Sequence, residues 1–220
     1  MRKLVFYIFI IFAFASCSFK TAPNDWQYKS ANYFSLYTNN FLKDNDILAK
    51  NDMRRAVDNA KKSADFTILA RIYLGECALN ISTGLQDKCE KYQMISDLLE
   101  DETLSSYYGL VTKTIKSQQI KSLPREYREY STYLEKSEFE EAGKYVFKTD
   151  KVTASLLMAS LMRENLTDAQ RDKLVKLASF HGYKKAVIFW LHESGKYAKD
   201  TQIAQSIDKK INVLNAKSER

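Results

Sequence analysis

The chain has 220 residues and carries 34 Lys and Arg against 27 Asp and Glu, a net charge of +7 at pH 7. This length suits one domain or two small ones and is sufficient to bury a hydrophobic core. The basic residues are spread out in pairs, which is typical of solvated helix faces and gives no indication of a nucleic-acid partner. With only 6 Gly and 2 Pro, the composition favours an all-α fold.

The first seventeen residues form the pattern of a secretory signal. Arg2 and Lys3 make a short basic head, and an apolar run over residues 4–16 ends directly before Cys17. A transmembrane helix needs ~20 apolar residues, so this run is too short to be a lasting anchor. The pattern therefore predicts a targeting segment rather than a fold element.

The end of this segment carries a more specific motif. The small pair Ala15-Ser16 before Cys17 resembles the lipobox of bacterial lipoprotein precursors, although Phe14 stands where Leu is usual. The resemblance implies that Cys17 is lipidated and becomes the new N-terminus. The alternative is an ordinary cleaved signal with a chance cysteine at its end.

The resemblance also divides the chain and gives it a location. It implies a signal peptide over residues 1–16, a lipidated cysteine with a short linker over 17–24, and a folded part over 25–220. Ser18, rather than Asp, follows the cysteine, which in such lipoproteins favours the outer membrane facing the periplasm. Stable anchoring requires more than one acyl chain.

Apolar residues at helical spacing predict about ten helices joined by short polar turns. We expect a single all-helical domain in which antiparallel helix pairs form a short α-solenoid or an irregular bundle. The helix over 64–81 has apolar residues on two faces, which predicts a central helix packed on both sides. The expected ranges are about 25–41, 46–62, 64–81, 85–99, 102–116, 124–147 with a break near Ser137, 152–163, 167–181, 183–192 and 201–214.

Two segments resemble parts of Sel1-like or tetratricopeptide repeats. Residues 182–195 combine Gly, a small Ala and aromatic residues, and residues 70–75 end in Leu-Gly. When Ala186 is aligned with Ala70, however, Leu191 falls where the second glycine belongs. The resemblance covers about a tenth of the chain and implies stacked helix pairs.

Cys77 and Cys89 are predicted to form a disulfide. Thr83 lies in the turn between two expected helices, and the cysteines are six residues before and six residues after it. At ~1.5 Å per residue, each cysteine is ~9 Å from the turn, so an antiparallel hairpin brings them level. An oxidising periplasm favours the bond. A catalytic or metal-binding pair is the alternative, but the spacing is not Cys-x-x-Cys and no His is near.

Glu193 is the only candidate for a catalytic acid. The sequence His192-Glu193-Ser194 is similar to the Glu-Ser of helical lytic transglycosylases, some of which are outer-membrane lipoproteins. A lone Glu needs a raised pKa and a sugar-binding cleft. Nothing after Tyr197 resembles the Gly-Leu-Met-Gln-like segment that helps those enzymes build the cleft. We therefore expect a surface carboxylate near a helix end, and no enzyme.

Other sites of chemistry are weakly indicated. His181 and His192 are eleven residues apart, and Gly182 between them predicts a helix break, so no metal site or cofactor is expected. Tyr127 and Tyr130 form an aromatic stripe that either packs in the core or, if exposed, forms a binding surface.

Two functions follow from these observations. The first is a membrane-anchored periplasmic lipoprotein that acts as a non-catalytic adaptor, with a protein partner in envelope assembly or secretion. The second is an enzyme or accessory of the cell wall, with Glu193 as its acid.

Overall fold

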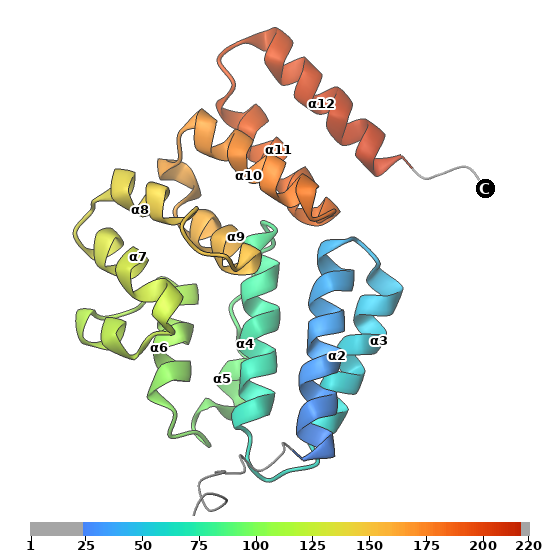
Figure 1. Ribbon diagram of the computed structural model, residues 1–220, viewed down its shortest axis with the longest axis vertical. Coiled ribbons are helices and arrows are strands. Elements are labelled where there is room, and N and C mark those ends of the chain that lie inside the picture. Colours follow the sequence, from blue (N-terminus) through green and yellow to red (C-terminus); the bar gives the residue numbers. More distant parts are fainter. Residues whose placement is uncertain (1–23, 217–220) are drawn as a thin grey trace, which may run out of the picture.

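The computed structural model describes residues 24–216 (Figure 1). Within this range helices supply all the regular secondary structure and no strand occurs, so the all-α prediction is confirmed. No helix in the described range is long and apolar enough to cross a membrane. The elements are α2 (Asp25–Leu42), α3 (Asp46–Ala60), α4 (Thr67–Ser82), α5 (Glu90–Ser96), α6 (Glu102–Val111), the 3-10 helix η1 (Ser117–Ser122), α7 (Arg125–Glu135), α8 (Phe139–Tyr145), α9 (Val152–Leu161), the 3-10 helix η2 (Arg163–Asn165), α10 (Asp168–Phe180), α11 (Lys184–Tyr197) and α12 (Thr201–Asn215).

Helices α2 and α3 form an antiparallel hairpin. Asp44 takes a left-handed conformation with φ 67° in the turn between them. Small residues of α3, including Ala49, Ala56 and Ala60, are buried and let the two helices approach closely. The buried Ser30 hydroxyl donates a hydrogen bond to the Ala56 carbonyl at 2.9 Å, which fixes the register of the pair.

Helix α4 serves two separate cores, as its two apolar faces predict. Leu74, Cys77 and Ala78 belong to the main core, which is formed by buried residues of α4 to α12. Leu69 and Leu79 belong to the hairpin core, which is formed by buried residues of α2, α3 and α4. The expectation of a central helix packed on both sides is confirmed, because both faces of α4 are covered.

The middle of the chain departs from the expected helix boundaries. The expected helix over 85–99 begins only at Glu90, and the one over 102–116 ends at Val111. Lys113 has φ 60° and turns the chain out of α6. The break near Ser137 is confirmed, since this residue has φ 58° between α7 and α8.

Two local signals near α10 are confirmed. Thr167 caps α10, because its hydroxyl accepts from the Gln170 amide at 3.3 Å and the Gln170 side chain accepts from the Thr167 amide at 2.9 Å. Gly182 has φ 66° between α10 and α11. His181 is therefore the C-cap residue of α10, while His192 lies in the next helix, α11.

The helices are arranged around α4 (Figure 1). This helix contacts α2, α3, α5, α6 and α9, while α10, α11 and α12 follow one another as a stack. Helix α11 also reaches the α2–α3 turn, where Lys184 pairs with Asp44 at 3.0 Å and Lys185 with Asp46 at 2.6 Å. The N-terminal hairpin is thus held by α4 and by the end of α11.

Candidate functional site

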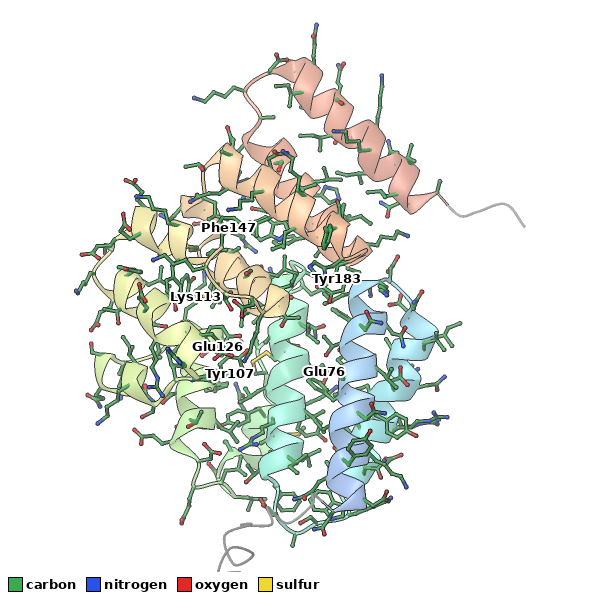
Figure 2. All side chains as sticks on the ribbon, in the orientation of Figure 1. Glu76, Tyr107, Lys113, Glu126, Phe147 and Tyr183 are labelled. Atoms are coloured by element: carbon green, nitrogen blue, oxygen red, sulfur yellow. A yellow bond between two sulfur atoms is a disulfide. The ribbon has the colours of Figure 1, made fainter. Side chains whose placement is uncertain are left out.

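Two adjoining cavities of about 120 Å³ and 380 Å³ form a groove beside α4. Both are lined by Gly75, Tyr107 and Tyr127, so we treat them as one site and call it the α4 groove. Phe34 of α2 lines one end, and Arg71 and Asp101 line the other. Figure 2 labels Tyr107, which belongs to α6, beside α4.

Gly75 sets the shape of the groove. A Cβ atom at this position would lie 2.4 Å from Cζ of Phe34, so only glycine permits the phenyl ring to rest where it does. A glycine inside a helix costs about 1 kcal/mol relative to alanine. At Gly75 this cost is offset by direct contact between the Phe34 ring and the backbone of α4.

Tyr107 and Tyr127 form the aromatic wall of the groove. Their ring centroids are 5.3 Å apart and the ring planes are tilted by 50°. Burial raises the pKa of Tyr107 to about 12, although the Tyr127 hydroxyl beside it acts in the opposite direction. Burial also raises the pKa of Tyr127 well above its ordinary value. Both hydroxyls are therefore neutral at physiological pH and can donate hydrogen bonds.

Pairs of opposite charge lie at the mouth of the groove. Lys151 donates a hydrogen bond to Glu126 at 2.6 Å, and Arg71 lies 3.8 Å from Asp101. Burial disfavours the charged form of Glu126, but the hydrogen bonds from Lys151 and from the backbone outweigh it, so the pKa of Glu126 lies below its usual range. The groove therefore offers both signs of charge around an aromatic, neutral interior.

The idea that Tyr127 and Tyr130 form an exposed binding surface is wrong. Tyr130 is fully buried and donates a hydrogen bond to the Met158 carbonyl at 2.6 Å, while Tyr127 is only 8 % exposed. This face of α7 is covered because it packs toward α9 and α6. The packing interpretation of the stripe is the correct one, although the largely buried Tyr127 also lines the α4 groove.

The structure pairs Cys77 with Cys89, as predicted. Their Cα atoms are 5.3 Å apart. The bond does not join two helices, as the expected hairpin would require. Cys89 lies just before α5 and has a left-handed conformation with φ 55°. Asp87 holds this segment by accepting hydrogen bonds from the Asn80 side chain at 2.7 Å and from the Cys89 amide at 2.7 Å.

Asp87 and the two cysteines are also close enough to suggest a metal site. Their potential ligand atoms lie within 4.8 Å of one another. Both sulfur atoms are joined to each other, however, and a metal would require free thiolates. The disulfide accounts for this cluster as a structural element.

Glu193 is not the surface carboxylate that we expected. It lies within α11 and is half-buried, and its Oε2 atom is buried without a hydrogen-bond partner among the described residues. Glu193 lines neither cavity of the α4 groove. The structure therefore places the candidate acid outside the groove.

Cys17 lies outside the described residues. No known protein family, curated protein or solved structure matches this chain. The lipidation of Cys17 and the resemblance to Sel1-like repeats therefore stay predictions. Most residues of the groove, including Arg71, Asp101 and Tyr107, carry no signal in the sequence. The one available signal is Gly75, because a glycine inside an apolar helix indicates close approach of another group.

Proposed function

We propose that the protein is a membrane-anchored periplasmic lipoprotein that acts as a non-catalytic adaptor in envelope assembly or secretion. The proposal of an anchor is based on the basic head, the short apolar run and Cys17. The proposal of an adaptor is based on one structural observation, the α4 groove. The partner is a protein that inserts a peptide segment into it.

The chemistry of the groove suits a peptide better than a bulky rigid ligand. Its interior combines aromatic rings with neutral hydroxyl donors, and its mouth carries both charge signs. Aromatic residues and arginine are the side chains that contribute most at protein interfaces. We expect the segment to place one apolar side chain against Tyr107 and Tyr127 and to exchange charged contacts with Arg71 or Asp101.

Site-specific photo-crosslinking in cells tests the adaptor proposal. Thr103 is exposed and lines the groove, while Ser105 is exposed on the same helix and does not line it. A photoreactive residue at 103 should give one discrete adduct that is absent from position 105. The exposed charge reversal Arg71→Glu should remove the adduct. Equal labelling from both positions, or no adduct at 103, would contradict the proposal.

The anchor is tested separately by Cys17→Ala. This change removes the only sulfur that can be acylated at the end of the signal, so the protein should move from the membrane fraction to the soluble periplasmic fraction. Unchanged fractionation would disprove lipidation at this residue, and the groove proposal would be unaffected.

A cell-wall enzyme with Glu193 as its acid is the second candidate. One observation favours it, namely the buried Oε2 atom without a partner, because catalytic acids are often carboxylates held away from water. Glu193→Gln preserves size and hydrogen bonding but removes the proton-transfer group. Full cellular activity of this variant would exclude the enzyme.

A further inference from the structure

Another cavity, separate from the α4 groove, lies between α6, η1, α7 and α9. It has a volume of about 250 Å³, which is below the roughly 300–1,000 Å³ of common ligand sites. Its walls are mainly apolar and come from Leu110, Ile115, Ile120, Leu134 and Leu161. We call it the α7 cavity; only a small ligand with an apolar body fits it.

The turn after α6 builds one wall of the α7 cavity. The Thr114 amide donates to the Gly109 carbonyl at 2.7 Å and folds the chain back over α6. A Cβ atom at Gly109 would lie only 3.1 Å from Cα of Ile115, so the turn packs directly on the helix. Ile115 is thereby held as a fixed part of the wall.

An unsatisfied polar group also lines the α7 cavity. Ser131 is 3 % exposed, and its Oγ atom has no hydrogen-bond partner among the described residues. A buried polar group without a partner costs about 1–3 kcal/mol. A ligand atom that hydrogen-bonds to this hydroxyl would recover part of that cost.

Two opposite charges stand at the mouth of the α7 cavity. Lys113 and Glu135 are exposed and line it, and within the described residues neither forms an ion pair or a side-chain hydrogen bond. Figure 2 labels Lys113. Lys113 holds a left-handed conformation, with φ 60°, that bulky side chains rarely adopt. The two charges are therefore both available to a ligand.

We propose that the α7 cavity binds a free α-amino acid with an apolar side chain. The side chain would occupy the apolar part of the cavity, and the carboxylate would pair with Lys113. The ammonium group would pair with Glu135 and donate a hydrogen bond to Oγ of Ser131, which lies one turn before Glu135 on α7. A simple carboxylic acid would leave Glu135 unpaired, and a simple amine would leave Lys113 unpaired. The site therefore selects a zwitterion.

Titration of the full chain in detergent with three probes tests the charge selection. The probes are L-leucine, 4-methylpentanoate and 3-methylbutylamine, which share the same branched body but carry both charges, only the carboxylate and only the amine. By calorimetry or NMR, L-leucine should bind at least about tenfold more tightly than either of the others. No saturable binding of L-leucine up to about 10 mM, or equal binding of the acid and L-leucine, would overturn the proposal.

Charge variants assign the two ends of the ligand. Lys113→Asn suits the left-handed backbone and should weaken L-leucine at least about tenfold while leaving 3-methylbutylamine unchanged. Glu135→Gln should weaken L-leucine and leave 4-methylpentanoate unchanged. Lys116→Gln is the matched control, since Lys116 is exposed near the same turn and does not line the cavity. Wild-type affinity in both Lys113→Asn and Glu135→Gln would refute the assignment.

Discussion

The hairpin core and the main core are built from different kinds of residue. The hairpin core relies on small alanines of α3 packed against Tyr37, Phe41 and Leu42 of α2. The main core buries Trp190 and Tyr130 completely and surrounds α9 on all sides. Helix α4 is the element that contributes buried residues to both. The contrast shows that one helix with two apolar faces can join a two-helix hairpin to a larger helical core.

The largest expected effect comes from removing a large side chain from the main core. Trp190 is completely buried, so Trp190→Ala should reduce the free energy of unfolding by about 3–5 kcal/mol. Urea unfolding followed by circular dichroism measures the loss. A loss below about 1 kcal/mol would contradict the central place of Trp190 in the main core.

The matching change in the hairpin core is Leu42→Ala. Leu42 is also completely buried, and its removal should cost about 2–5 kcal/mol at that site. Because α4 is the one described helix that has fully buried residues in both cores, amide exchange should accelerate more in α2 and α3 than in α9. Equal acceleration in α9 would show that the two cores unfold as one unit.

Loss of the disulfide is the next largest effect and concerns the main core alone. The double variant Cys77→Ser, Cys89→Ser opens a loop with a sequence separation of 12, which should cost about 3 kcal/mol in the chain-entropy model. Amide exchange near α5 should accelerate most. Identical unfolding curves for the wild-type protein with and without reductant would contradict a stabilising bond.

These two cores also show what the sequence could and could not predict. The disulfide, the two-faced helix α4, the break at Ser137 and the cap at Thr167 all depend on signals within one short stretch of the chain, and all are present. The prediction that a helix begins at residue 85 was wrong. The hydrogen bonds accepted by Asp87 and the disulfide at Cys89 keep residues 85–89 out of a helix. Local propensity contains neither restraint.

The α4 groove and the α7 cavity could not be predicted, because their walls come from segments far apart in the chain. The α4 groove needs Phe34, Gly75 and Tyr127 together, and no spacing along the sequence relates them. The same limit explains Tyr130, whose helical stripe is compatible with either packing or exposure. Only the position of α9 decides in favour of packing.

Alkaline pH should affect the main core before the hairpin core. Burial raises the pKa of Tyr107 to about 12 and also raises the pKa values of Tyr127 and Tyr130. In the hairpin core, Tyr37 is the one fully buried tyrosine, and burial raises its pKa too. Above the unfolded value of about 10, the unfolded chain loses these protons first, so stability falls as pH rises. Each tyrosine adds a slope of up to ~1.4 kcal/mol per pH unit.

The variant Tyr107→Phe tests this pH dependence. It keeps the ring against Tyr127 but removes the hydroxyl, so the loss of stability between about pH 10 and 12 should become shallower. Tyr28→Phe is the control, since Tyr28 is 64 % exposed. Urea midpoints measured across this range give the slopes, and parallel slopes for wild type and Tyr107→Phe would contradict the expectation.

The smallest effect concerns the ion pairs that link α11 to the hairpin. Lys185→Gln removes the contact with Asp46, and partly exposed pairs of this kind contribute about 0–1 kcal/mol. The loss should shrink further in salt near 1 M, because charges are then screened within about 3 Å. Lys176→Gln, which breaks an exposed pair within α10, is the control for a change that does not join the two regions. A larger loss for Lys176→Gln than for Lys185→Gln would contradict the linking role of Lys185.

The position of α12 has a practical meaning for a tethered protein. Helix α2 begins at one end of the long axis, and the α10–α12 stack forms the opposite end (Figure 1). A lipid on Cys17 would sit only eight residues before the start of α2. If Cys17 is lipidated as proposed, the distance between the lipid surface and a reporter fused after α12 would measure how far the α10–α12 stack lies from the membrane.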